Sequence, residues 1–296
     1  MKILLTGCFG FISSHIAARL LNGGHEVLGF DNLVNPSLYP SERIKSATGP
    51  NWKNFKFYKY DIREREGMIS ICTNERPDLI VHMAALGSIS RSFLDPAETI
   101  DVNERGFANI LCMASVLGIK RVVFASSSNV YGAAEQDVRV EGEEGAVMNP
   151  YGLSKRHNEI LARIWSNQSG IEYIGLRFFN VYGPGQNPNG PYAAVIPRFC
   201  LDKDLTIFGD GSNTRDFTYV GDVAKIVETA MLHKMNNFCV NVGTGQETSI
   251  LELANLLADG RDIVYKPARA GEIKHSKASV ENLKRILNIS PYTPLI

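Results

Sequence analysis

Short runs of branched and aromatic residues alternate with amphipathic segments from the amino terminus to Val242. A short apolar run bounded by turn residues predicts a strand, and apolar residues near i, i+3, i+4 and i+7 predict a helix. The clearest helical patterns cover Ile12–Leu21 and Asn103–Leu117. The expected strands are residues Lys2–Thr6, Glu26–Phe30, Phe55–Tyr60, Leu79–Met83, Arg121–Ser126, Tyr173–Arg177 and Phe238–Val242. This alternation predicts an α/β fold, in which helices cover both faces of a parallel sheet.

The composition changes after Asn180. Residues from Gly183 to Pro191 are rich in Gly, Pro and Asn, which is typical of a loop and marks the start of a smaller C-terminal lobe. The strand expected at Phe238–Val242 can return to the main sheet, so the two units interleave along the chain. The predicted larger unit is residues 1–179 with 217–245, and the smaller unit is residues 180–216 with 246–296.

The net charge of the chain limits the kinds of partner that can be inferred, but it does not indicate a reaction. The 296 residues include 31 Lys and Arg and 31 Asp and Glu, so the formal net charge is zero. This balance gives no argument for binding nucleic acid or a membrane surface, and any bound anion must be held by a few local cations. The acidic segment from Glu135 to Glu144 is predicted to be a solvated loop.

The five cysteines are scattered and form no C-x-x-C pair. Their spacing predicts reduced thiols and no metal site. The apolar run at the amino terminus is too short for a signal sequence, and no segment approaches the roughly 18 apolar residues of a transmembrane helix. We therefore expect a cytoplasmic protein.

A glycine-rich turn follows the first strand and leads into a helix. Gly7 and Gly10 are spaced G-x-x-G and are followed by Phe11 and Ile12. Glycines in this context let the backbone approach a pyrophosphate, and the helix N-terminus supplies N–H donors. This predicts a Rossmann-type, doubly wound dinucleotide-binding sheet.

Acidic and small residues follow the next strands. Asp31, 24 residues after Gly7 and followed by Asn32, can bind the adenosine ribose hydroxyls, and no neighbouring Arg is present to bind a 2′-phosphate, so NAD is favoured over NADP. The remaining candidates at the carboxyl edge of the sheet, where a flat cofactor can lie, are Asp61, Ile62, Ala84 and Ala85. We assign no chemistry to His82.

Tyr151 and Lys155 are the candidate reactive residues. Their i, i+4 spacing at a helix start places the phenol and the ammonium on one face, where Lys155 can stabilise a tyrosinate. Ser127, at the end of a predicted strand, can share a hydrogen bond with a substrate hydroxyl and relay its proton. A Y-x-x-x-K pattern alone is common by chance, and the serine strengthens its interpretation as a catalytic motif.

Together these motifs resemble the extended short-chain dehydrogenase/reductase family, in particular its NAD-dependent nucleotide-sugar epimerases and dehydratases. The resemblance also includes S-S-S-N-V-Y-G from Ser126, L-R-F-F-N-V-Y-G from Leu176 and R-D-F-T-Y-V from Arg215, and covers nearly the whole chain. It implies NAD as the cofactor and a smaller C-terminal lobe that binds a nucleotide sugar.

The resemblance also implies a reaction. Dehydratases of the family carry an acidic pair where this chain has Ser128 and Asn129, so epimerisation is favoured. Within the epimerases, residues 84–92, 188–197 and 271–276 are most similar to bacterial UDP-N-acetylglucosamine 4-epimerases, which act in surface-polysaccharide synthesis. A UDP-glucose 4-epimerase, an epimerase of another UDP-sugar, a dehydratase and a non-catalytic NAD-binding protein remain the alternatives.

The family resemblance assigns further residues to the substrate. Arg215 and Arg269 are expected to bind the UDP diphosphate together with Asn180, and Glu272 to hold the uridine ribose. Serine at position 276 is a small residue at the position that limits pocket size, so we expect 2-acetamido sugars to be accepted. The other expected sugar-pocket residues are Gly87, Ser127, Ser128, Tyr151 and Ala194. Family members commonly dimerise through helices matching residues 103–117 and 152–168, so we expect a homodimer.

Overall fold

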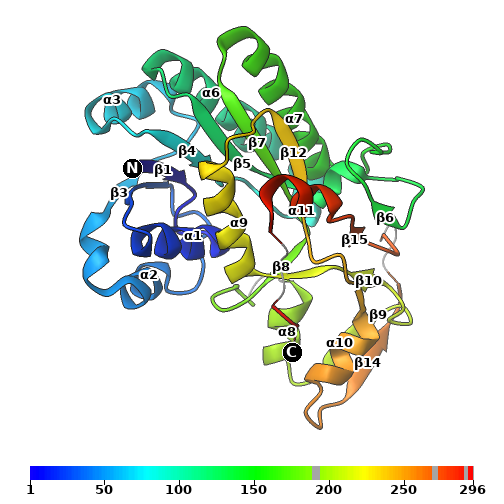
Figure 1. Cartoon of the computed structure of the whole chain (residues 1–296). Coiled ribbons are helices and arrows are strands. Elements are labelled where there is room, and N and C mark those ends of the chain that lie inside the picture. Colours follow the sequence, from blue (N-terminus) through cyan, green and yellow to red (C-terminus); the bar gives the residue numbers. More distant parts are fainter. Residues whose placement is uncertain (189–193, 269–272, 290–292, 296) are drawn as a thin grey trace.

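The computed structural model describes residues 1–188, 194–268, 273–289 and 293–295. Its main element is a seven-stranded parallel sheet with the strand order β12-β7-β5-β4-β1-β2-β3 (Figure 1). The strands are β1 (Lys2–Thr6), β2 (Glu26–Asp31), β3 (Phe55–Lys59), β4 (Leu79–His82), β5 (Arg121–Ser127), β7 (Glu172–Phe178) and β12 (Phe238–Val242). All seven strands were predicted from the sequence, and the expected doubly wound, Rossmann-type sheet is confirmed.

Helices cover both faces of this sheet because alternate strand residues point to opposite sides. In β1, Ile3 and Leu5 pack in one core and Leu4 packs in the other. The first core is covered by α1 (Phe11–Asn22), α9 (Val220–Leu232) and α11 (Glu281–Leu287). The second core is covered by α3 (Arg65–Glu75), α6 (Gly106–Leu117) and α7 (Pro150–Ser169). Helix α2 (Pro40–Thr48) packs beside α1.

The helix predicted at Asn103–Leu117 differs at its beginning. After the short helices α4 (Ile89–Leu94) and α5 (Pro96–Ile100), residues Asp101–Arg105 form a turn of π-helix before α6. The buried Asn103 side chain accepts from the backbone N–H of Leu86 at 2.8 Å and donates to its carbonyl at 3.1 Å. The π turn thus carries a side chain that holds the loop after β4.

The smaller lobe has its own apolar core and lies below the sheet in Figure 1. That core packs α8 (Val195–Leu201) and α10 (Ile250–Leu257) against β9 (Leu205–Phe208) and β14 (Ile263–Lys266). The remaining strand pairs are β6 (Val138–Arg139) with β15 (Lys277–Ala278), β8 (Asn180–Tyr182) with β11 (Phe217–Tyr219), and β10 (Thr214–Arg215) with β13 (Thr248–Ser249). Strand β12 returns to the main sheet beside β7. The division of the chain into two interleaved units stays a prediction.

The acidic segment from Glu135 to Glu144 is only partly the solvated loop that we predicted. Glu135 and Glu143 are exposed, but the Glu144 carboxylate is 9% exposed and forms an ion pair with Arg177 at 2.6 Å. Glu141 accepts from the backbone N–H of Asn241 at 2.8 Å. Glu144 therefore belongs to the interior, where it balances the charge of Arg177 on β7, and Glu141 joins the segment to the backbone of β12.

Candidate active site

A cavity of about 880 Å³ runs along the carboxyl edge of the sheet and into the smaller lobe. Most of the residues proposed from sequence line it, from the glycine turn after β1 to the start of α7. Those lining residues are Gly7, Gly10, Phe11, Ile12, Asp31, Asn32, Ile62, Ala84, Ala85, Gly87, Ser127, Ser128, Tyr151, Lys155, Asn180, Arg215 and Ser276. Asp61 and Ala194 lie outside the lining, and Arg269 and Glu272 lie outside the described residues.

The turn after β1 has the shape that a pyrophosphate requires. Gly7 has a φ of +63°, and a Cβ atom there would lie 2.8 Å from the Cα of Ala84. Gly10 is the N-cap of α1, and its N–H donates to the Gly7 carbonyl at 2.9 Å. Backbone and a helix N-terminus therefore face the cavity without intervening side chains, which fits a dinucleotide.

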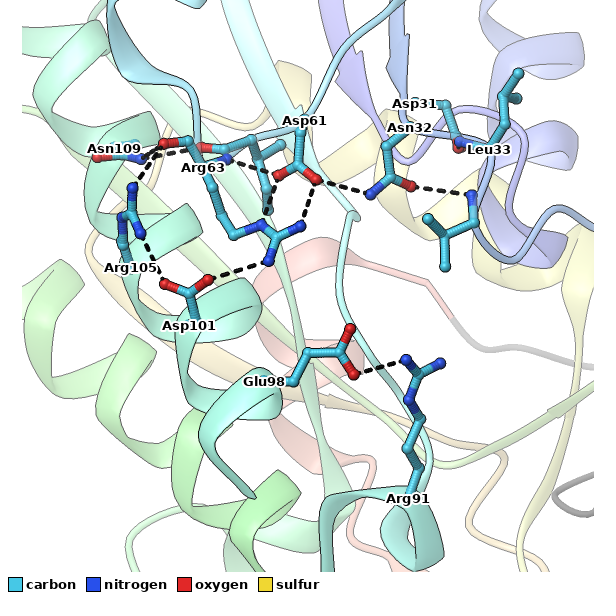
Figure 2. A network of polar contacts seen from close by, with 12 residues as sticks. Asp31, Asn32, Leu33, Asp61, Arg63, Arg91, Glu98, Asp101, Arg105 and Asn109 are labelled. Carbon is cyan, nitrogen blue, oxygen red and sulfur yellow. Dashed lines mark hydrogen bonds and ion pairs between the residues drawn. The ribbon is translucent and has the colours of Figure 1, made fainter. Parts of the chain in front are cut away.

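Asp31 ends β2, and Asp61 lies two residues after the end of the neighbouring strand β3 (Figure 2). Asp31 accepts backbone N–H bonds from Phe9 at 2.9 Å and Leu33 at 2.7 Å, which fix its carboxylate at the end of β2. Asp61 accepts from the Asn32 amide at 3.0 Å and from Arg63 through both oxygens, at 2.9 and 2.8 Å. The Arg63 guanidinium holds the pKa of the Asp61 carboxyl well below its usual range.

Arg63 was missed by the sequence analysis although it lines the cavity. Its guanidinium also donates to Asp101 at 3.1 Å, on the π turn before α6, so its charge is balanced by two carboxylates (Figure 2). Because Arg63 is already paired, it does not provide an uncompensated cation for a 2′-phosphate. Its arrangement agrees with a preference for NAD.

The candidate reactive groups meet at the start of α7. The Lys155 side chain is 2% exposed, and its ammonium donates to the Ala125 carbonyl at 2.9 Å and lies 6.0 Å from the centre of the Tyr151 ring. Burial lowers the pKa of Lys155 to about 8. Burial raises the pKa of Tyr151, and a hydrogen bond with Ser127 acts in the opposite direction.

The opposite wall of the cavity comes from the smaller lobe. Ser276 is buried there, and its carbonyl accepts from the Asp216 N–H at 2.9 Å. Arg139, also missed by the sequence analysis, is 7% exposed and lines the cavity. Its guanidinium donates to the carbonyls of Ala134, Gln136 and His275, at 2.8, 2.7 and 3.2 Å. Arg139 therefore holds the segment that presents Ser276.

Two features bear on the class of site. Within the described ranges, no three or more His, Cys, Asp or Glu residues are grouped so that they could hold a metal ion. In the same part of the chain, no helix has the length and apolar character needed to cross a membrane.

His82 is buried, hydrogen-bonds Thr6 at 2.8 Å, and burial lowers its pKa to about 3. Its neutral ring packs against Phe107.

The fold and the cavity define a dinucleotide-binding protein with a tyrosine and a lysine at the reactive end. Residues 3–243 match the model of the NAD dependent epimerase/dehydratase family, and the chain belongs to that family. NAD is therefore its cofactor, in agreement with the geometry of Gly7 and Asp31.

Three relatives illustrate the likeness. UDP-glucose 4-epimerase from Neisseria meningitidis serogroup C is 34% identical over 92% of this chain and 87% of its own length. The structure of Thermotoga maritima UDP-glucose 4-epimerase with UDP-glucose superimposes with a TM-score of 0.91 at 32% identity, covering 100% of this chain and 95% of that one. UDP-N-acetylglucosamine 4-epimerase from Methanobrevibacter ruminantium, in complex with UDP-N-acetylmuramic acid, gives 0.89 at 31% identity, covering 98% and 93%.

Proposed function

We propose that this protein catalyses the NAD-dependent 4-epimerisation of a UDP-hexose, interconverting UDP-GlcNAc and UDP-GalNAc through a 4-keto sugar. One observation carries the proposal: Tyr151, Ser127 and Lys155 line the same cavity as the small side chain of Ser276. UDP-glucose and UDP-galactose form the alternative pair of substrates. The relatives described above support both choices, since one acts on the N-acetylated sugar and two on UDP-glucose.

The chain's own residues supply the acid–base chemistry. Tyr151, as phenolate, removes the proton of the sugar 4-OH, and Ser127 orients that hydroxyl. Lys155 binds the nicotinamide ribose and favours the phenolate through its charge. NAD, when bound there, would supply the hydride acceptor for C4 and the donor that returns the hydride to the opposite face of the 4-keto sugar. Because the cofactor is regenerated in each turnover, it can stay bound.

The sugar must turn over between the two hydride transfers, which requires a firmly held nucleotide and a loosely held ring. We assign the diphosphate to Arg215, whose guanidinium suits phosphate oxygens, and to Asn180. Arg269 and Glu272 are proposed for the diphosphate and the uridine ribose. The sugar is assigned to Gly87, Ser127, Ser128, Ala194 and Ser276, which offer small or hydroxyl side chains.

We also propose that the enzyme is a homodimer. Helices α6 and α7 contact each other and lie side by side at the top of Figure 1. They carry exposed apolar side chains: Val116 is 65% exposed, Ile164 57%, and Leu153 and Ile160 38% each. A second copy packing on this face would bury them. A cytoplasmic location and a role in polysaccharide synthesis accompany this proposal.

The first experiment separates the candidate substrates. Purified protein is incubated without added NAD with UDP-GlcNAc or with UDP-glucose, and the anomeric protons are followed by NMR. We expect UDP-GalNAc to form faster than UDP-galactose. Conversion of UDP-glucose alone would keep the reaction and reject the assignment of Ser276. No conversion of either sugar, also with NAD added, would reject the proposed substrates.

A dehydratase is the second candidate, and the residues in the turn after β5 favour the epimerase over it. Ser128 and Asn129 stand where an acid and a base would be needed, and neither side chain titrates as a carboxylate. Mass spectrometry of the NMR samples tests this directly, because dehydration removes one water from the sugar and epimerisation leaves its mass unchanged.

A further inference from the structure

Two asparagine side chains connect the start of α7 to Ser127. Asn149 is the N-cap of α7, and its Oδ1 accepts from the Gly152 N–H at 2.7 Å. The Asn149 Nδ2 donates to Asn129 Oδ1 at 3.3 Å, and the Asn129 Nδ2 donates to Ser127 Oγ at 3.2 Å. The backbone N–H of Asn129 donates to the same serine oxygen at 3.2 Å. This series of hydrogen bonds ends at Ser127, which lines the same cavity as Tyr151 and acts to lower the pKa of that phenol.

The first hydrogen bond, from the Gly152 N–H to Asn149, determines which group donates in each of the following bonds. A backbone N–H can only donate, so the Asn149 oxygen must face Gly152 and its NH₂ group must face Asn129. The amide oxygen of Asn129 therefore faces Asn149, and its NH₂ group faces Ser127. The helix cap thus sets the orientation of both amides.

The hydroxyl of Ser127 can consequently act only as a hydrogen-bond donor toward any further partner. A hydroxyl has two acceptor lone pairs and one proton to donate. The two N–H groups of Asn129 occupy both lone pairs, so the hydroxyl of Ser127 acts as a donor toward Tyr151 or the substrate oxygen. This differs from the relay expected from the sequence, in which Ser127 would accept a proton and pass it on.

We propose that Asn129 is a positioning residue that restricts Ser127 to donating its hydrogen bond, so that Tyr151 takes the proton of the sugar 4-OH directly. The inference rests on the proposed catalytic roles of Tyr151 and Ser127. The O4–H bond breaks and a Tyr151 O–H bond forms, while Ser127 keeps its own proton throughout. Hydride leaves C4 for the bound NAD in the same half-reaction, so the sugar loses two electrons and the cofactor gains them.

The charged groups around this pair have other partners. Lys155 on α7 donates to the Ala125 carbonyl, and Arg139 from β6 donates to three carbonyls. Behind the neighbouring Ser126, Glu159 accepts from its hydroxyl at 2.6 Å and is paired with Arg177. Arg215 in the lobe wall donates to the Thr214 carbonyl at 2.7 Å. Asn129 is thus the group that sets how Ser127 meets the phenol.

The first test replaces Asn129 with alanine. Without the amide, Ser127 can also accept from the neutral phenol, which favours the protonated form and raises the pKa of Tyr151. We expect the acidic limb of the kcat–pH profile to move up by about one unit, so that kcat falls about tenfold on that limb and equals wild type at high pH. A loss of kcat equal at every pH would show a merely structural role and overturn the proposal.

Asn149→Asp provides a matched variant that keeps the helix cap, because Asp and Asn are equally good N-caps. It removes the N–H that fixes the Asn129 amide, so the amide can turn its oxygen toward Ser127. We expect the same upward shift of the acidic limb with an unchanged melting temperature. A profile identical to wild type would contradict the proposed chain of bonds.

The Ser127→Ala background separates an effect that acts through Ser127 from a loss of packing at position 129. If Asn129 acts through Ser127, the double variant Ser127→Ala, Asn129→Ala should match Ser127→Ala alone. Additive losses would overturn the proposal.

A titration without substrate keeps the inference separate from the proposed reaction. The ultraviolet absorbance of tyrosinate is followed with pH in the NAD-bound protein, and the Tyr151→Phe titration is subtracted. A raised Tyr151 pKa in Asn129→Ala supports the inference whichever sugar is the substrate. An unchanged value rejects it, even where the wild type epimerises UDP-GlcNAc as proposed.

Discussion

At the scale of single residues, the site combines side chains whose roles follow from type and spacing with others that only the fold reveals. Tyr151 and Lys155 are recognisable because one helical turn separates them and a serine follows a strand. Arg63 and Arg139 carry no such pattern, since an isolated arginine is usually a surface residue. Only their positions at the cavity and their hydrogen bonds show that Arg63 fixes Asp61 and that the buried Arg139 holds the segment of Ser276.

Replacement of Tyr151 by phenylalanine tests the proposed base. Phenylalanine retains the ring packing but has no oxygen to take the sugar proton, so we expect kcat to fall at least about a hundredfold. The content of bound NAD and the Kd for UDP should stay close to wild type, because the diphosphate and dinucleotide are assigned to other residues. Single-turnover NMR measures the rate of the reaction, and calorimetry measures binding. An active variant would reject the assignment of Tyr151 as the base.

Ser276→Tyr tests the proposed size limit. A tyrosine would occupy the cavity beside the segment that Arg139 holds, leaving less room for a 2-acetamido group. We expect kcat/KM for UDP-GlcNAc to fall at least about tenfold relative to that for UDP-glucose. Ser276→Ala is the control. It keeps a small side chain at position 276, so the ratio of kcat/KM for the two sugars should stay at the wild-type value. Equal losses for both sugars in the tyrosine variant would show that position 276 does not select between them.

At the scale of elements, the buried arginine of β7 connects the sheet to α7 and to the loop before it. Arg177 forms ion pairs with Glu159 at 2.8 Å and Glu144 at 2.6 Å, and donates to the Tyr131 hydroxyl at 2.9 Å. Tyr131 donates in turn to Asn241 on β12 at 2.6 Å. The network therefore holds the helix of Tyr151 against the strands behind it.

Arg177→Met should destabilise the fold because it removes the buried cation of two buried carboxylates and leaves them only the partly exposed Arg156. We expect the free energy of unfolding to fall by about 3–5 kcal/mol, the range for breaking a buried ion pair from one side. Arg156→Met is the matched control, since Arg156 also pairs with Glu144, at 3.1 Å, but is one-third exposed. Its cost should stay within about 1 kcal/mol. Urea unfolding at fixed NAD concentration compares them, and equal costs would contradict this reading of the network.

The same network shows how far the sequence predicts the elements. The strands and the ligand edge of the sheet can be predicted from the sequence, because both follow from short apolar runs and the residues directly after them. The partners of Glu144 and Glu141 are not, because each carboxylate meets a group far along the chain. An arginine within the apolar run of β7 was the available signal that a buried carboxylate would be required.

At the scale of the whole molecule, the seven-stranded sheet explains why the proposed catalytic and binding residues from distant segments share one cavity. Parallel strands end at the same edge, so β1, β2, β4 and β5 bring their terminal residues together, and residues on both sides of β12 in the chain, such as Arg215 and Ser276, form the opposite wall. The cavity occupies that edge, which leaves the outer faces of α6 and α7 available for a second copy.

The proposed homodimer is tested on those faces with Ile160 and Ile164, which lie one turn apart on α7. Replacing both with glutamate would place two carboxylates in an apolar interface, whereas in a monomer both side chains would remain in water. Wild type should have twice the single-chain mass by light scattering after size exclusion, and the double variant should have the single-chain mass with an unchanged unfolding midpoint. Leu256→Glu is the control, because Leu256 is 54% exposed on α10 in the smaller lobe and should leave the dimer intact. A dimeric double variant would place any interface elsewhere, and a monomeric wild type would reject the dimer.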